Sequence, residues 1–385
     1  MIEKIYEMKH KDSGCKARTG LLTLGHGVVR TPAFMPVGTN GTVKALYHKT
    51  VSDMGYNLIL GNTYHLYLRP GCDVLKTFDG LHKFSSWEHN ILTDSGGFQI
   101  FSLSDLRKIY EEGIKFQSHI DGSHHEFTPE KVVDVQQVIG SDIAMVLDVC
   151  SEPGIDWNKT LKAMDLTHAW AERSIVRRDS LEALTGRAFR GKLFGIVQGG
   201  FYEDLRLQSA KTISDMDFPG IAIGGLSVGE SKDTYMHFLG LTADAVTYEK
   251  PRYVMGIGTV DYILEAVYNG IDLFDCVLAA REGRHGTVFT DDGMLNLKKS
   301  FLEYDHGPIT ENCNCTACTK YSRAYMRHMF KANEMLGSVL ASEHNLQYLY
   351  NLMKRVREAI EKDDFVRFKN EYLERFYANG GLAVK

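Results

Sequence analysis

Short runs of apolar residues recur along the chain, and the segments between them have the periodicity of amphipathic helices. The runs are rich in β-branched and aromatic residues, with Gly, Asn or Asp close to the end of each, as is typical of buried strands. Eight such runs are present, at residues 32–39, 56–63, 90–97, 142–149, 192–200, 220–225, 252–258 and 273–280.

Strands that are apolar throughout and alternate with helices indicate a parallel sheet that is covered on both faces. Eight strand-helix units are the number that closes a (β/α)₈ barrel, so the sequence predicts an α/β protein with a TIM-barrel fold. The main alternative is an open, doubly wound sheet. The chain lacks the G-x-G-x-x-G motif that would follow the first strand of a dinucleotide-binding sheet of that kind, which favours the closed barrel.

Two segments interrupt or follow the repeating pattern. The long interval between the third and fourth runs contains "SHIDGSHHEF", which we interpret as an inserted hairpin or loop. After Ala280 the pattern changes to a cysteine cluster and then to long helical sequence. We therefore expect a barrel core over residues 1–285, with its eighth helix completed by C-terminal residues, and a zinc-binding subdomain with C-terminal helices over residues 286–385.

Composition and charge narrow the class of protein. The 385 residues are 44% hydrophobic and 24% charged, which is ordinary for a folded globular chain and argues against disorder. The N-terminus has no apolar segment of the signal-peptide kind, and no stretch is long and apolar enough to span a bilayer. We expect a cytoplasmic protein with no membrane partner.

The formal net charge is −5, so the chain as a whole does not attract nucleic acid. A nucleic-acid partner would therefore have to bind a local patch of basic residues. Between Met294 and Lys331 basic residues outnumber acidic ones, an excess that is equally compatible with an ordinary solvated face. The basic residues of this segment are Lys298, Lys299, Lys320, Arg323, Arg327 and Lys331.

Carboxylates stand at the ends of three predicted strands. Asp94 ends the third strand, Asp148 the fourth and Asp275 the eighth, and the carboxyl ends of barrel strands converge on the catalytic face. Each aspartate alone could simply cap the following helix. Together they would repel one another, which suits one acid to act as a nucleophile and another to carry a proton. Such a pair can perform substitution at the anomeric carbon of a sugar.

Residues near these acids predict the shape of the ligand. Two glycines after Asp94 permit close approach of the backbone, and Phe98 and Met255 could supply flat or polarizable walls for a planar heterocycle, although each could also be ordinary core. The Gln198 amide, the Asp148 carboxylate and the backbone near Gly225 combine donors and acceptors that could read the edge of a purine.

The cysteine cluster has the spacing of a metal site. Cys313, Cys315 and Cys318 form C-x-C-x₂-C, and a tetrahedral structural zinc needs a fourth ligand. His344 lies 26 residues beyond Cys318 and is the best candidate, because the other late histidines stand beside a turn or on a predicted amphipathic helix. A site with four protein ligands leaves no position for a reacting water, so we expect one structural Zn²⁺.

Several motifs occur together in the order of a known family: "GNTYHLYLRPG", "ILTDSGGFQIFSLS", "LFGIVQGG", "GGLSVGE", "FDCV", and "CNCTAC" followed by "EHN". Over nearly its whole length the chain resembles the bacterial tRNA-guanine transglycosylases, or queuine tRNA-ribosyltransferases. The resemblance implies a (β/α)₈ barrel with a zinc subdomain, and a pentosyltransferase with no nucleotide cofactor. Its partners would be a tRNA with a GUN anticodon, whose wobble guanine is exchanged, and a 7-deazaguanine base.

The resemblance also implies roles for individual residues. Asp275 looks like the nucleophile that attacks C1′ and forms a covalent ribosyl ester, and Asp94 looks like the general acid/base, oriented by Asn62 and Thr63. Arg281 and Arg284 fall where the family holds the anticodon loop. The base-reading residues and stacking walls would be Asp148, Gln198, Gly225, Leu226, Phe98 and Met255. Tyr321, Tyr325 and His328 share one helical face in a region that the family uses for a homodimer interface.

The chain departs from the bacterial pattern at two places. After the fourth strand it has Asp148-Val149-Cys150 where the pattern is D-E-C, and after the eighth it has Ala279-Ala280-Arg281 where the pattern is P-T-R. Loss of the glutamate removes an anion that could help a cationic aminomethyl base such as preQ1. Val228, however, matches the family members that use preQ1. We expect preQ1 as the incoming base, with direct insertion of queuine as the alternative.

Two other classes of protein explain part of the pattern. A retaining glycosidase also uses two carboxylates on a barrel, but it would not need a zinc appendage and would line its cleft with tryptophans, of which the chain has only three. A non-catalytic RNA-binding module explains the metal site and the arginines but not the acids at the strand ends.

Overall fold

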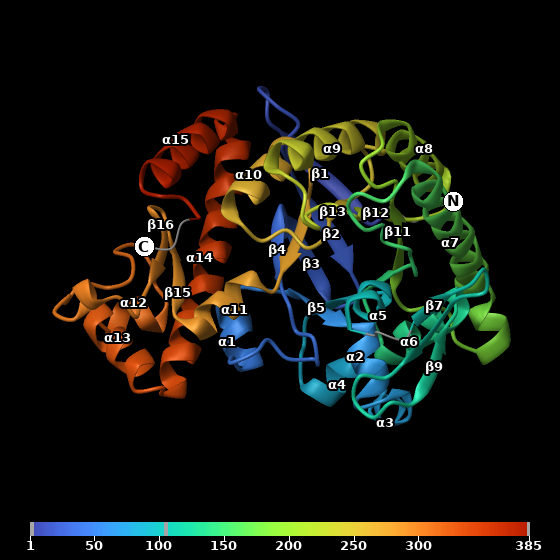
Figure 1. Cartoon of the computed structure of the whole chain (residues 1–385), viewed down its shortest axis with the longest axis horizontal. Helices are drawn as coiled ribbons and strands as arrows, with labels where there is room; N and C mark the ends of the chain where they lie inside the picture. The colour runs from blue at the N-terminus through green and yellow to red at the C-terminus, as the bar shows by residue number, and fades with distance from the viewer. Residues whose placement is uncertain (1–3, 104–106, 383–385) are drawn as a thin grey trace.

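The eight apolar runs form one parallel sheet in the computed structural model, which describes residues 4–103 and 107–382 (Figure 1). The order of strands is β4-β14-β13-β12-β11-β10-β6-β5, and a parallel bridge between Val37 and Leu60 joins the two edges. The sheet therefore closes, and the predicted barrel is confirmed. Its strands are β4 (Ala33–Pro36), β5 (Leu58–Asn62), β6 (Asn90–Asp94), β10 (Ile143–Met145), β11 (Lys192–Val197), β12 (Gly220–Ile223), β13 (Arg252–Val254) and β14 (Leu273–Cys276).

Helices surround the barrel, and the strands are buried on both faces, as their apolar sequences predict. The two largest clusters of buried residues combine residues of the strands with residues of these helices, and the second also includes residues that precede the first barrel strand. The helices that follow the barrel strands are α1 (His48–Asp53), α2 (Thr63–Leu68), α3 (Cys72–Thr77), α4 (Leu81–Ser85), α5 (Gly97–Leu103), α6 (Pro129–Ile139), α7 (Trp157–Thr185), α8 (Glu203–Asp215), α9 (Lys232–Ala245), α10 (Val260–Tyr268) and α11 (Leu278–His285).

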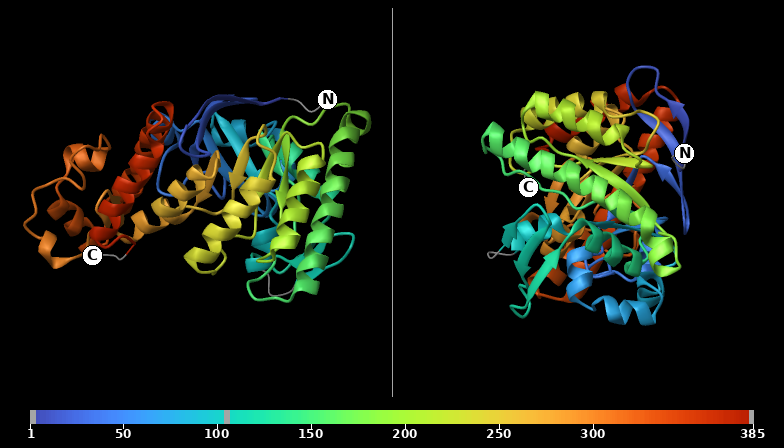
Figure 2. Two further views of the ribbon diagram at one scale, coloured as in Figure 1. Left: turned by 90° about the horizontal axis from the view of Figure 1, so that it is seen from above. Right: turned by 90° about the vertical axis from the view of Figure 1, so that its right-hand side faces the viewer.

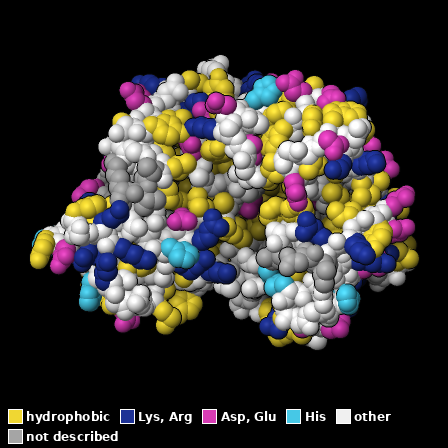
Figure 3. Space-filling view, viewed as in Figure 1, with side chains coloured by type: hydrophobic (Ala, Val, Ile, Leu, Met, Phe, Trp, Pro, Cys, Tyr) yellow, Lys and Arg dark blue, Asp and Glu magenta, His cyan; other side chains and the backbone are white. Residues whose placement is uncertain are grey.

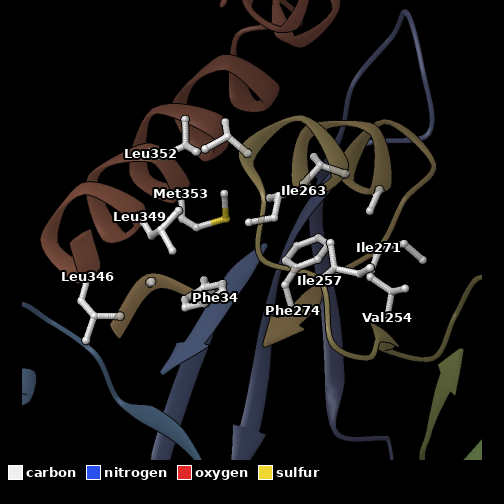
Figure 4. Packing of buried hydrophobic residues seen from close by; sticks show 14 of the residues in the cluster. Phe34, Val254, Ile257, Ile263, Ile271, Phe274, Leu346, Leu349, Leu352 and Met353 are labelled. Atoms are coloured by element: carbon white, nitrogen blue, oxygen red, sulfur yellow. The ribbon is translucent and has the colours of Figure 1, made fainter. Parts of the chain in front are cut away.

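A late helix, α14 (Met335–Glu361), packs on the barrel beside the first and last strands. Figure 4 shows Leu349 and Met353 of this helix close to Phe34 of β4, with Phe274 of β14 nearby, and all four belong to one buried cluster. Burial of such large apolar side chains is the main favourable contribution to packing of this kind. Residues far along the chain thus cover a side of the barrel.

The elements between the barrel and α14 extend to one side (Figures 1 and 2). A third buried cluster, which includes Cys313 and Cys315, forms their core together with the start of α14. These elements are β15 (Thr287–Thr290), β16 (Gly293–Asn296), the 3₁₀ turn η1 (Ser300–Leu302), α12 (Thr316–Lys320) and α13 (Arg323–Lys331). The last helix, α15 (Phe365–Ala378), belongs to the buried cluster that covers the barrel. No helix among the described residues is long and apolar enough to cross a membrane.

The insertion between the third and fourth barrel strands is an antiparallel sheet of three strands, β7 (Arg107–Ile109), β8 (Ile114–Gln117) and β9 (His124–Phe127). The predicted hairpin is β8 and β9, whose register pairs Phe116 with His125.

A second antiparallel sheet, β1 (Tyr6–Lys11), β2 (Arg18–Leu24) and β3 (Gly27–Thr31), was not predicted. It lies at the end of the barrel opposite α5 and α11 (Figure 2). The fully buried Arg18 attaches it to the barrel by donating from Nε and Nη2 to Asp272, at 3.0 and 2.6 Å, just before β14. This ion pair joins residues 254 positions apart, so local sequence patterns give no sign of it.

Candidate active site and metal centre

The three aspartates lie at the carboxyl ends of their strands. Asp94 is the last residue of β6, Asp275 lies in β14, and Asp148 follows β10. Asp94 and Asp148 are buried and Asp275 is half-buried. They are close enough that the charges of Asp275 and Asp148 both act on Asp94. The barrel therefore gathers three acids around one site, as the sequence predicts.

Asp94 is held by the end of the neighbouring strand. Asn62 Nδ2 donates to Asp94 Oδ2 at 2.6 Å, and the Thr63 backbone N–H donates to Oδ1 at 3.1 Å. The side-chain oxygen Oδ1 of Asn62 accepts from the backbone N–H of His65 at 3.0 Å and caps α2, which leaves the amide nitrogen directed toward Asp94. The structure thus brings Asn62 and Thr63 to the acid that they were expected to orient.

The pKa of Asp94 is raised to about 7. Burial is the largest cause, the charges of Asp275 and Asp148 add to the rise, and the backbone N–H groups of Thr63 and Gly96 oppose it. A carboxyl group with a pKa near neutrality exchanges a proton readily in both directions, which is what general acid/base catalysis requires.

Asp148 and Gln198 form a second pair. Gln198 Nε2 donates to Asp148 Oδ2 at 2.7 Å, and Ser95 Oγ donates to Oδ1 at 3.3 Å. Burial raises the pKa of Asp148 to about 6. Gln198 Oε1 is buried and has no hydrogen-bond partner among the described residues, so one acceptor is available for a ligand N–H.

The backbone beside Gln198 is fixed by Arg206, a residue that sequence reasoning missed. Its buried guanidinium donates to the carbonyls of Gly200 and Gly224 at 2.8 Å and to that of Gly225 at 3.1 Å. These bonds hold the turn of Gly225, whose φ is +68°, and of the buried Leu226 after β12. The signal was available, because Arg206 is a charged residue on the otherwise apolar face of α8.

Asp275 receives two hydrogen bonds on the same oxygen. Tyr253 Oη donates to Asp275 Oδ1 at 2.5 Å, and the Gly256 backbone N–H donates to it at 2.8 Å. Burial raises the pKa of Asp275, and these two donors oppose that rise. Burial and the charge of Asp275 hold the pKa of Tyr253 well above 10, so the phenol stays a donor. The other oxygen, Oδ2, has no hydrogen-bond partner among the described residues. Tyr253 was not singled out in the sequence.

The glycines after Asp94 are required by close packing. Gly96 has φ of +83°, and a Cβ there would lie 3.0 Å from the backbone nitrogen of Tyr64. A Cβ on Gly97 would lie 3.0 Å from the carbonyl oxygen of Asp148. Phe98, next in the chain, leaves half of its surface exposed, and Met255 after β13 is half-buried. An exposed aromatic ring at this position is available for stacking.

Arg281 and Arg284 lie on α11, directly after the strand that carries Asp275. Arg281 is exposed and Arg284 half-buried. Figure 3 shows one face of the molecule in the orientation of Figure 1. Lys and Arg side chains gather on it in the region where α11, α12 and α13 lie in Figure 1. The exposed basic residues of these elements and of the segment between them include Arg281, Lys298, Lys299, Lys320 and Lys331.

The four predicted metal ligands meet in one cluster, with all ligand atoms within 4.8 Å of one another. His344 Nδ1 lies 3.7, 3.5 and 3.3 Å from the sulfurs of Cys313, Cys315 and Cys318. A tetrahedral zinc with ordinary Zn–S and Zn–N bonds would separate sulfur from nitrogen by about 3.6 Å. His344 Nε2 donates to the Phe289 carbonyl at 2.9 Å, which turns Nδ1 toward the sulfurs. The cluster can therefore hold a metal ion.

Tyr321, which lies between α12 and α13, stacks its ring on that of Tyr325 on α13 with centroids 5.0 Å apart, and His328 is exposed one turn further along α13. Tyr325 is 36% exposed, so this aromatic pair is only partly covered by its own chain.

Comparison with known proteins agrees with this geometry. The family model described as queuine tRNA-ribosyltransferase matches residues 12–378. A protein named queuine tRNA-ribosyltransferase from Caldanaerobacter subterraneus is 50% identical over 97% of this chain and 98% of its own, and one from Treponema denticola has the same values. A relative of the same name from Borrelia duttonii is 48% identical over 98% of this chain and 100% of its own. The chain therefore belongs to the queuine tRNA-ribosyltransferase family, the tRNA-guanine transglycosylases, which are pentosyltransferases.

Proposed function

We propose that this transglycosylase exchanges guanine at the wobble position of a tRNA with a GUN anticodon for a 7-deazaguanine base, preferably preQ1, through a covalent bond between Asp275 and ribose. The observation that carries the proposal is that the neighbouring carboxylates of Asp275 and Asp94 have different environments. Asp275 keeps one oxygen free while Tyr253 and Gly256 hold the other, and Asp94 has a pKa of about 7.

In the first step, Asp275 Oδ2 forms a bond to C1′ of the nucleotide, and the C1′–N9 bond to guanine breaks with its electron pair going to the base. The protonated carboxyl of Asp94 gives its proton to the departing guanine. The donors on Asp275 Oδ1 fix the direction of the free oxygen, and such positioning lowers the entropic cost of attack.

In the second step, the incoming base occupies the vacated pocket. The Asp94 carboxylate takes the proton from its N9, N9 forms a bond to C1′, and the ester bond to Asp275 breaks to restore the carboxylate. Asn62 and Thr63 hold Asp94 in place for both transfers. The same carboxyl group thus serves as acid and then as base.

The base is read by Asp148, Gln198 and the backbone of Gly225 and Leu226. The free Oε1 of Gln198 would accept from an N–H of the heterocycle, and Arg206 would keep the backbone of the turn in place. Phe98 and Met255 would stack on its two faces. Because guanine and 7-deazaguanine bases share the pyrimidine edge, one set of groups can read both.

The RNA is bound by the basic face over α11 to α13. The exposed Arg281 and Lys298 would contact phosphates of the anticodon arm. Such a local basic surface is needed because the chain has a net charge of −5. The half-buried Arg284 would contact the loop nearer the site.

With tRNA as substrate, the enzyme would work in the cytoplasm. We also propose a homodimer that covers the face of Tyr321, Tyr325 and His328.

Replacing Asp275 with Asn removes the nucleophile. We expect incorporation of radiolabelled guanine into tRNA to fall by at least about a thousandfold, because loss of a covalent nucleophile removes the whole pathway. The wild-type enzyme, denatured during turnover, should carry RNA through a bond that the variant does not form. Asp73→Asn, a change on a fully exposed aspartate, is the matched control and should keep wild-type exchange. Release of free sugar, or RNA binding without exchange in the wild type, would contradict the proposal.

The identity of the incoming base is tested by competition. With preQ1 and queuine at equal concentration, we expect the wild-type enzyme to insert mostly preQ1 into tRNA. Val149→Glu restores an anion next to Asp148 and should increase the preference for cationic preQ1, whereas Val149→Gln, which has the same shape without the charge, should not. Preferential insertion of queuine by the wild type would show that the base is assigned wrongly.

We propose that the metal in the cysteine cluster is one structural Zn²⁺ per chain. Cys318→Ser should lose the metal and loosen the C-terminal elements, because His344 stands on the helix that packs against the barrel. Metal analysis and hydrogen exchange of residues 287–331 would measure both effects. Cys72→Ser, at a cysteine outside the cluster, should retain the metal. Purified protein without stoichiometric zinc, or a Cys318 variant that keeps it, would refute this assignment.

A further inference from the structure

A second cluster of metal-ligating side chains lies at the opposite end of the barrel from the three catalytic aspartates. It consists of His26 in the turn between β2 and β3, His82 on α4, and Asp142 immediately before β10. One ligand atom from each lies within 4.8 Å of the others. The cluster is independent of the transglycosylase site, because it lies at the amino-terminal ends of the strands.

The two imidazoles share one carboxylate. His26 Nδ1 lies 2.7 Å from Asp142 Oδ1, and His82 Nε2 lies 3.2 Å from Oδ2. Their rings stack with centroids 3.8 Å apart and planes inclined by 18°, which brings both nitrogens to the same side. A cation about 2.1 Å from each of its ligand atoms separates adjacent ligand atoms by about 3.0 Å in octahedral coordination, and the two contacts observed lie on either side of that value.

The charge of Asp142 is poorly compensated. Its side chain is only 3% exposed, and among the described residues its ion-pair partners are these two histidines, with no Lys or Arg. The Ile91 backbone N–H also donates to Oδ2, at 2.8 Å. A buried carboxylate without a cation beside it is unfavourable.

We propose that His26, His82 and Asp142 bind a divalent transition-metal ion of the Ni²⁺, Co²⁺ or Zn²⁺ class. Two imidazole nitrogens and one carboxylate oxygen suit these ions and not Mg²⁺ or Ca²⁺, which prefer oxygen ligands throughout. In each imidazole, the ring nitrogen that faces Asp142 would bind the metal in place of its proton. The proton would then be carried by the other nitrogen of the same ring. His26, with 41% of its side chain exposed, leaves room for water to complete the coordination.

Such an ion would join three elements, which are the turn between β2 and β3, helix α4 and the start of β10. The His26 backbone N–H already donates to Asn90 Oδ1 at 3.0 Å, so the β2–β3 turn is positioned against the start of β6. A shared metal would add α4 and β10 to this junction and stabilise the N-terminal sheet on the barrel, because an ion bound only by the folded chain favours folding.

The test counts nickel in untagged protein whose cysteine cluster keeps its own metal. After equilibrium dialysis against Ni²⁺, we expect about one more bound Ni²⁺ per chain in the wild type than in His26→Gln or His82→Gln, and a higher melting temperature in the wild type only. His26→Gln lies in an exposed turn and should fold normally, which circular dichroism would verify.

His10→Gln is the matched control, because His10 also pairs with a carboxylate, Asp363 at 3.0 Å, but without a second imidazole beside it. It should bind as much Ni²⁺ as the wild type. Equal nickel content in the wild type and both cluster variants would overturn the proposal, as would an equal loss in His10→Gln. Guanine exchange is not needed as a readout, so failure here leaves the proposed function untouched.

Discussion

Closure of the barrel forces carboxylates that are far apart in the chain to share one poorly solvated space. The bridge between Val37 and Leu60 completes the ring, and the carboxyl ends of β6, β10 and β14 then face a common site. Burial raises the pKa values of Asp94, Asp148 and Asp275, and the charges of the other two acids raise that of Asp94 as well. The proposed roles of Asp275 as nucleophile and Asp94 as proton carrier rest on this constraint.

Helix α14 connects the metal centre to that site. His344 belongs to the cysteine cluster, and the next residue, Asn345, donates to the carbonyls of Ala279 and Thr287 at 2.9 and 3.0 Å. Leu346, one residue further, joins the buried cluster that covers the barrel. Ala279 stands on α11, directly after the strand of Asp275. A metal ion in this cluster would therefore act on the site of the three aspartates through the packing of a helix.

The sequence predicted features that depend on local pattern or on fixed spacing. The eight strands were recognisable because each is an apolar run of β-forming residues, and the metal cluster because C-x-C-x₂-C has few other uses. Asp94 and Asp148 could be placed at one face because parallel barrel strands end on one side. Acids gathered at one face in turn predicted chemistry at a sugar.

The missed features depend on contacts across long stretches of sequence. The N-terminal sheet was missed because its strands carry many polar residues and because the Arg18–Asp272 pair, which attaches it, spans most of the chain. Arg206 and Tyr253 act on backbone carbonyls and on an acid that only the folded barrel brings near them. Neither residue belongs to a motif that the sequence analysis recognised by its chemistry.

The central claim is that burial raises the proton affinity of Asp94 and that the charges of the neighbouring acids raise it further. Carbon-13 NMR of protein labelled at the aspartate carboxyl carbons, with Asp94 assigned from the spectrum of Asp94→Asn, would follow its titration directly. The account predicts a pKa of about 7 in the wild type and a lower value in Asp275→Asn, where one repelling charge is gone. An Asp94 that titrates near 4, or whose pKa is the same in both proteins, would contradict it.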